Sequence, residues 1–143
     1  MTASKQIYFD DVEVGSIGPE KRHALTRTDL VQYAGASGDY NPMHHDEVKA
    51  KAAGLPSVFG HGMLSAGLLA GAVVDFVGVG SLKRYAVRFT KQTWPDDVLV
   101  TTVTVKAKRD ETGEVDLECV LATDAGVVVV TGEATATLPK REG

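Results

Sequence analysis

The sequence predicts an α+β domain in which an antiparallel sheet wraps around one long helix, and two observations lead to this prediction. Residues 62–77 are almost entirely apolar or small, which is typical of a helix that is buried on most sides. Residues 84–138 instead alternate between apolar and polar side chains, as antiparallel strands with one buried face do. A central buried helix followed by long strands is an arrangement of the α+β class.

Length and composition fit one ordinary domain. The chain has 143 residues, of which 43% are hydrophobic and 24% are charged. Domains of this size can bury a core of their own, so we expect residues 1–143 to form a single domain. The net charge of −4 argues against nucleic-acid binding, because nucleic-acid-binding domains are usually strongly basic.

The cysteine count and the N-terminal sequence exclude further classes of protein. Cys119 is the single cysteine, which excludes an intrachain disulfide and a multi-cysteine zinc site. It lies on the apolar phase of a predicted strand, so we expect a core residue. Residues 1–10 lack the apolar segment of a signal peptide, and the longest apolar run, Ala66–Val74, is too short for a membrane span. We therefore expect a cytoplasmic protein.

The first half of the chain carries the helix signals. Thr26 followed by Asp29 is a capping pattern, and the helix that it begins must end near Gly35–Gly38. Residues Asp46–Ala53 predict a short helix that Gly and Pro residues terminate. The apolar segment Gly62–Val77 predicts the long central helix.

The second half predicts a meander of antiparallel strands joined by turns at Pro95–Asp97, Asp110–Gly113 and Asp124–Gly126. One face of these strands is expected to be buried. The side chains expected on that face are Tyr85, Val87, Phe89, Leu99, Val103, Val105, Val115, Leu117, Cys119, Leu121, Val128, Val130, Gly132, Ala134, Ala136 and Leu138.

The segment from Ser37 to His44 is the first candidate for chemistry. Gly38 frees the backbone and Pro42 breaks the chain direction, so Asp39 and His44 can converge on one bound water or substrate atom. The alternative is an Asx-type turn in which Asp39 or Asn41 caps a helix and His44 lies on the surface. The local pattern alone leaves both interpretations open.

A metal site is a further interpretation of this region. His44-His45-Asp46-Glu47 contains metal-binding residue types, but adjacent residues on a helix diverge and no ligand follows at helical spacing. We therefore expect no metal. His61 fits a packing or hydrogen-bonding role in the loop before the long helix better than the role of a proton carrier.

Three motifs carry a resemblance to a known family. They are Tyr33-Ala-Gly-Ala-Ser-Gly-Asp-Tyr-Asn-Pro-Met-His44, Gly60-His-Gly-Met-Leu64 and Tyr85-Ala-Val-Arg-Phe-Thr90. In this order and spacing, the chain resembles the MaoC-like hydratase and dehydratase family of the hotdog fold, over essentially its whole length. The resemblance implies that Asp39 and His44 form the catalytic pair and that the Gly62 backbone N–H binds the thioester carbonyl.

The resemblance also implies the reaction. A member of this family would perform (R)-specific hydration of trans-2-enoyl thioesters in fatty-acid metabolism, or the reverse dehydration of 3-hydroxyacyl thioesters, on coenzyme A or an acyl carrier protein, without a cofactor. It would pair as a homodimer or with a related hotdog subunit. The alternatives are a hotdog subunit that binds an acyl thioester without hydrating it, and a hotdog thioesterase.

The candidate substrate-binding residues are Asn41, His61, Arg84 and Arg88. Lys83, Arg84, Arg88 and Lys91 form a basic cluster on the outward phase of one strand. This cluster is either a solvated strand face or a landing site for coenzyme A phosphates or an acidic carrier protein.

The chain departs from the family at one position. Some members carry a serine on the long helix that supports the catalytic aspartate, whereas this chain has Ala70 there and its one serine in that helix is Ser65. A backbone group or a water molecule is then expected to orient Asp39.

Overall fold

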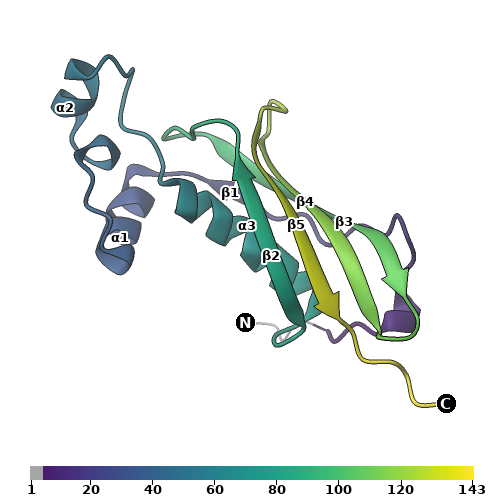
Figure 1. Cartoon of the computed structure of the whole chain (residues 1–143). Helices are drawn as coiled ribbons and strands as arrows, with labels where there is room; N and C mark the ends of the chain where they lie inside the picture. Colours follow the sequence, from purple (N-terminus) through teal and green to yellow (C-terminus); the bar gives the residue numbers. More distant parts are fainter. Residues whose placement is uncertain (1–4) are drawn as a thin grey trace.

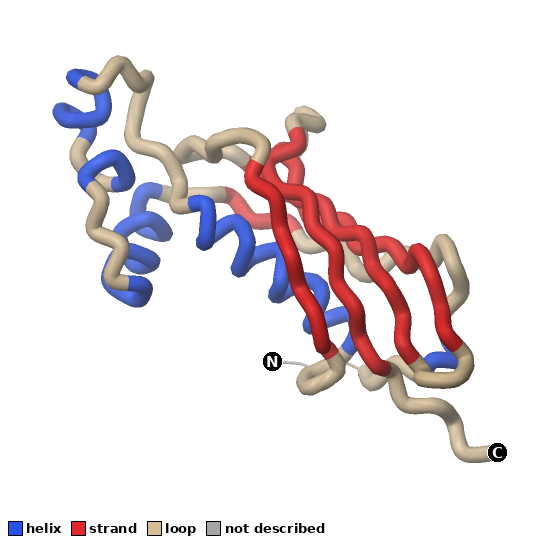
Figure 2. Tube along the Cα trace, in the orientation of Figure 1, coloured by secondary structure: helices blue, strands red, loops and turns tan. Residues whose placement is uncertain are grey.

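The computed structural model describes residues 5–143 and shows a five-stranded antiparallel sheet curved around one helix (Figure 1). The strand order is β1-β3-β4-β5-β2. Helices and loops of residues 26–61 form a separate group beyond one end of the sheet (Figure 2). The elements are η1 (Phe9–Asp11), β1 (Arg22–Ala24), α1 (Arg27–Ser37), η2 (Pro42–His44), α2 (Glu47–Ala52), α3 (Gly62–Val77), β2 (Leu82–Phe89), β3 (Val98–Arg109), β4 (Glu114–Thr123) and β5 (Val128–Thr137).

The predicted helices are confirmed, with ends that follow from their caps. At the start of α1, the Thr26 hydroxyl accepts a hydrogen bond from the Asp29 N–H at 3.1 Å, and the Asp29 carboxylate accepts one from the Thr26 N–H at 2.8 Å. The helix ends at Gly38, which has a left-handed φ of 76°. This conformation turns the chain directly into the segment that carries Asp39.

The core lies between α3 and the inner face of the sheet. Leu69, Val73 and Val77 of α3 are fully buried, and α3 contacts β2, β3, β4 and β5. Cys119 is a buried core residue, as predicted, and burial raises the pKa of its thiol to about 12. No helix within residues 5–143 combines the length and the apolar character that crossing a bilayer requires.

The predicted strand connection between β2 and β3 is wrong. Strands β3, β4 and β5 do form a meander, but β2 pairs with β5 at the opposite edge of the sheet from β1. The turn at Pro95–Asp97 does not close a hairpin, because its backbone bonds to Leu25 beside β1: the Asp96 N–H donates to the Leu25 carbonyl and the Leu25 N–H to the Asp97 carbonyl, both at 2.8 Å. The short strand β1, which these bonds extend, was not predicted.

The predicted alternation also fails at the start of β5. Val128 was expected on the buried face but is 38% exposed. The cause is a β-bulge, since Leu121 pairs with Val130 and Ala122 with Val128, which leaves Val129 as an extra residue. From Val130 onward, the buried positions follow the predicted phase.

One stripe of α3 is uncovered, although the sequence predicted burial on most sides. Met63 is 61% exposed. Apart from the adjacent turns of the helix itself, no described heavy atom lies within 4 Å of the Cβ position that a side chain would have at Gly67 or Gly71. The sheet therefore covers only one side of α3.

Candidate active site

Two successive Asx-type turns shape the segment between α1 and η2. The Asp39 carboxylate accepts a hydrogen bond from the Asn41 N–H at 3.2 Å, and the Asn41 side-chain oxygen accepts one from the Met43 N–H at 3.1 Å. The turn interpretation of this sequence is therefore correct. Its second part is wrong, because His44 is 6% exposed rather than on the surface.

These turns bring Asp39 and His44 face to face. The two side chains are 52% and 7% exposed, and the Asp39 Oδ2 to His44 Nε2 distance is 3.9 Å. His44 Nδ1 lies 2.6 Å from the Phe59 carbonyl oxygen. Because a carbonyl can only accept, Nδ1 carries a proton and donates it to Phe59, which leaves Nε2 facing Asp39.

The 3.9 Å separation is too long for a direct hydrogen bond and short enough for one shared oxygen atom. A water that makes hydrogen bonds of about 2.8 Å to both atoms would subtend an angle of roughly 90° between them. When a carboxylate is ionised and an imidazole is neutral, both accept hydrogen bonds, so one water can donate to both groups and keep its oxygen lone pairs free.

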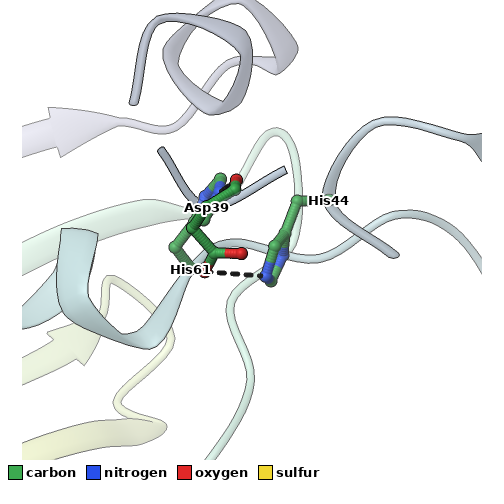
Figure 3. A group of neighbouring side chains, drawn as sticks. All are labelled: Asp39, His44 and His61. Atoms are coloured by element: carbon green, nitrogen blue, oxygen red, sulfur yellow. Dashed lines mark hydrogen bonds and ion pairs between the residues drawn. The ribbon is translucent and has the colours of Figure 1, made fainter. Parts of the chain in front are cut away.

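His61 packs against both members of the pair (Figure 3). Its ring is 1% exposed and stacks on His44 with centroids 3.8 Å apart and an interplanar angle of 27°. Its Nε2 lies 3.2 Å from the Asp39 carbonyl oxygen. Burial lowers the pKa of His61, and the hydrogen bond to Asp39 partly opposes this shift. These contacts are those of a packing and hydrogen-bonding residue, and direct substrate binding by His61 stays a prediction.

Asp39, His44 and His61 also offer three metal-ligand atoms within 4.8 Å of one another. A metal ion requires nitrogen lone pairs that converge, whereas the lone pairs of two stacked rings run side by side. Each histidine in addition directs one ring nitrogen to a backbone carbonyl. The arrangement suits proton transfer better than metal binding.

The N-terminus of α3 lies directly after His61. No side chain of the described residues caps this helix, and Gly62 lines a cavity of about 290 Å³. A Cβ at Gly62 would lie 3.2 Å from the ring of Phe89, which is 50% exposed. A helix N-terminus with free N–H groups attracts negative charge, so the Gly62 N–H suits a developing oxyanion. The residues lining the cavity are Phe59, Gly60, Gly62, Ser65, Phe89, Thr90, Lys91, Gln92, Thr93 and Val130.

A backbone group holds Asp39 in the absence of the family's serine. The hydrogen bond from the Asn41 N–H fixes Oδ1, which leaves Oδ2 facing His44. From the sequence, we expected either a backbone group or a water molecule to orient Asp39, and the Asn41 N–H is a backbone group. Ser65 is 3% exposed and lines the cavity beside Gly62.

The structure does not bring Arg84 and Arg88 to this cavity. They line hollows on the outer face of the sheet, and Arg84 lies 3.6 Å from Glu133 of β5. Their role in substrate binding stays a prediction. Lys91 of the same basic cluster lies in the cavity that Gly62 lines. The sequence analysis placed Lys91 in the basic cluster but did not distinguish it from Lys83, Arg84 and Arg88.

Comparisons with known proteins agree with this architecture. Residues 13–126 match the family model described as a MaoC like domain. An (R)-specific enoyl-CoA hydratase of Rhodospirillum rubrum is 31% identical over 136 residues, which are 94% of this chain and 93% of that protein.

Two solved structures are similar as well. The R-hydratase PhaJ1 of Pseudomonas aeruginosa has a TM-score of 0.87 and 30% identity, covering 95% of this chain and 88% of that one. A chain of the ChsH1–ChsH2 complex of Mycobacterium tuberculosis has a TM-score of 0.79 and 26% identity, covering 88% of this chain and 98% of that one.

A five-stranded antiparallel sheet wrapped around a central helix defines a hotdog protein. The chain belongs to the MaoC-like family. The predicted fold class and family are confirmed.

Proposed function

We propose that this protein catalyses the (R)-specific hydration of trans-2-enoyl thioesters and the reverse dehydration of 3-hydroxyacyl thioesters. The observation that carries this proposal is the 3.9 Å separation of Asp39 Oδ2 and His44 Nε2, which leaves room for one water that would donate to both atoms. The enoyl-CoA hydratase and R-hydratase relatives support the reaction class and the stereochemistry.

The proposed reaction uses His44 as base and acid in turn. Nε2 takes a proton from the bound water because an imidazole is a stronger base than an ordinary carboxylate, and the water oxygen bonds to the β-carbon of the enoyl group. The electron pair of the double bond moves onto the thioester oxygen, where the Gly62 N–H stabilises the enolate. The His44 imidazolium then returns the proton to the α-carbon. Asp39 orients the water and offsets the transient positive charge on His44.

Substrate binding is proposed around the Gly62 cavity. The acyl thioester would enter beside Phe89 and Lys91, and the Lys91 ammonium suits the phosphate groups of coenzyme A or the acidic surface of a carrier protein. Asn41 contributes by shaping the turn that holds Asp39. Arg84 and Arg88 would contribute only if the carrier reached the outer face of the sheet.

We also propose that two hotdog subunits associate. The uncovered stripe of α3 and the unpaired edge of β2 leave apolar surface and backbone groups that a second subunit would cover. The partner is either a second copy of this chain or a related subunit, as in the ChsH1–ChsH2 complex. Residues 1–143 would form one such domain in the cytoplasm.

Sedimentation should give a dimer near 30 kDa, twice 15.1 kDa, and a stable monomer at micromolar concentration would contradict the pairing.

The decisive experiment follows the loss of enoyl absorbance with crotonyl-, octenoyl- and dodecenoyl-CoA, with chiral analysis of the product. We expect the (R)-3-hydroxyacyl thioester, at a rate that depends on chain length. Binding without turnover would identify an acyl-binding subunit instead. Release of free thiol, measured in the same samples, would identify a thioesterase.

A further inference from the structure

His61 has a feature that packing alone does not explain. Its ring is 1% exposed, yet its Nδ1 has no hydrogen-bond partner among residues 5–143. A buried polar atom without a partner destabilises a fold, and an apolar ring in the same place would avoid that cost. Fold stability therefore does not account for a histidine at this position, and a function of the ring does.

The hydrogen bond of His61 reaches the main chain of Asp39. Since the Asp39 carbonyl can only accept, Nε2 of His61 carries the proton and Nδ1 is the unpartnered acceptor. This bond ties the residue before α3 to a segment 22 residues earlier in the chain. The Asp39 side chain is 52% exposed and has few packing contacts to hold it, so the anchored carbonyl limits its movement relative to His44.

The ring of His61 supports His44 from one face. The two rings stack at 3.8 Å, and Tyr33 of α1 packs edge-on against His61 with centroids 4.8 Å apart. The titratable groups that face His61 are Asp39, His44 and His45. Burial is the main cause that lowers the pKa of His61, the two histidines lower it further, and only Asp39 opposes the shift. A neutral aromatic face attracts the imidazolium that His44 becomes during turnover, whereas a cationic face would repel it.

We propose that neutral His61 is a positioning residue of the acid–base pair. Its N–H fixes the backbone of Asp39, and its ring face holds His44 and stabilises the protonated state of that residue. The proposal rests on the hydratase function above, but His61 itself does not touch the reacting atoms. This role differs from the predicted substrate contact of His61.

Two substitutions separate the two contacts. His61→Gln keeps an N–H donor but removes the ring, and His61→Phe keeps a ring face but removes the donor. We expect kcat to fall about 10–100-fold in each, the usual effect of misplacing a catalytic group, with KM changed by less than about threefold. The melting temperature of His61→Phe should stay close to that of the wild type, because the loss of the unpartnered Nδ1 offsets the loss of the bond to the Asp39 carbonyl. The neighbouring exposed His45, changed to Gln, is the matched control and should keep the wild-type kcat.

The proposal is overturned if both His61 variants keep the wild-type kcat, if only KM changes, or if kcat falls only in proportion to the folded fraction measured by circular dichroism. A second measurement does not depend on activity. Nitrogen-15 NMR of the ring nitrogens should show His61 neutral at pH 7, with its proton on Nε2. A cationic His61 or a proton on Nδ1 at that pH would also overturn the proposal. If the wild type itself hydrates no enoyl thioester, the proposed function fails, and the NMR result still tests the state of His61.

Discussion

The sheet and the segment from Gly38 to His61 are held in place in different ways. Strands β3, β4 and β5 share long backbone ladders, each interrupted by one register shift, and their inward side chains, such as Val103 and Leu121, are 1% exposed. The segment that carries the acid–base pair relies instead on single contacts, including those from Asn41 to Asp39 and from His44 to Phe59. Many weak, redundant contacts determine the stability of the first region, whereas a few specific bonds determine the geometry of the second. Substitutions in the two regions should therefore have separable effects.

The largest expected effect comes from the pair itself. Asp39→Asn and His44→Ala should each reduce kcat about 10²–10⁴-fold, because each removes one acid–base group from the reaction. The double variant should be little worse than the poorer single one, since both groups act on the same water. Steady-state kinetics with an enoyl-CoA measures this.

Circular dichroism should show that both single variants remain folded, because the sheet that dominates stability is unchanged. Near wild-type turnover in either folded variant would remove the pair from the mechanism. Equal losses of activity and of stability would instead show that the two regions are not separable.

A somewhat smaller effect is expected at the start of α3. Gly62→Pro removes the N–H proposed to bind the enolate, and proline is tolerated at the first position of a helix. The preceding His61 has φ −59° and ψ 133°, which a residue before proline can adopt. We expect turnover to fall about 10²–10³-fold, the usual cost of losing an oxyanion donor, while a saturated acyl-CoA still binds within about a few-fold of its wild-type affinity.

The control for this variant is Gly62→Ala, which keeps the N–H. Its methyl group would meet the Phe89 ring at 3.2 Å, and that half-exposed ring has room to shift. If the proline variant turned over substrate as fast as the alanine variant, Gly62 would be a close-packing residue and the oxyanion donor would lie elsewhere.

A substitution in the sheet should lower the stability of the fold and leave kcat nearly unchanged. Leu121→Ala removes a side chain that is 1% exposed and should lower the free energy of unfolding by about 2–5 kcal/mol. Below the melting temperature, the kcat per folded molecule should remain close to that of the wild type. Val120→Ala, on the outer phase of the same strand, should cost much less, and denaturant unfolding compares the two. A large loss of kcat in folded Leu121→Ala would show that the sheet also determines the site geometry.

Local patterns in the sequence predict some parts of the fold, whereas contacts between distant segments determine others. The limits of α3 and the buried phase of β3 and β4 follow from periodicity and caps, which are local properties. The pairing of β2 with β5 could not be predicted in this way, because bonds between Asp96 and Leu25, far apart in the sequence, decide the path of the chain. The bulge at Val129 is likewise a property of two paired strands rather than of one.

The candidate site was likewise predictable only in the parts that short motifs carry. The motif around Asp39 and His44 identified the pair, and the Gly60–Leu64 motif identified the start of α3. The stacking of His61 on His44 and the position of Lys91 in the cavity depend on how distant segments fold together. The spacing of residues within one motif cannot predict contacts between motifs.

The smallest expected effect concerns Glu47, which links the start of α1 to the loop before Phe59. Its carboxylate accepts hydrogen bonds from Arg27 of α1 at 2.7 Å, from the Ser57 hydroxyl at 3.1 Å and from the Val58 N–H at 3.4 Å. The hydrogen bond from Arg27 is the main cause that lowers the pKa of Glu47, from 4.5 to about 2. Residues 57 and 58 lead directly to Phe59, which holds His44.

A carboxylate whose pKa is lowered by folding stabilises the folded state above its unfolded pKa, and this contribution is lost as the pH falls through the folded pKa. Glu47→Gln should therefore lower the melting temperature modestly at pH 7, and the difference from the wild type should shrink as the pH falls from about 4.5 toward 2. The exposed Glu20, paired only with its near neighbour Arg22, provides the control, and Glu20→Gln should show a smaller difference at pH 7. A Glu47→Gln deficit that stayed constant across this range would mean that the bond to Arg27 does not depend on the ionised carboxylate. Loss of stability without any loss of kcat would show that the His44–Phe59 bond persists without Glu47.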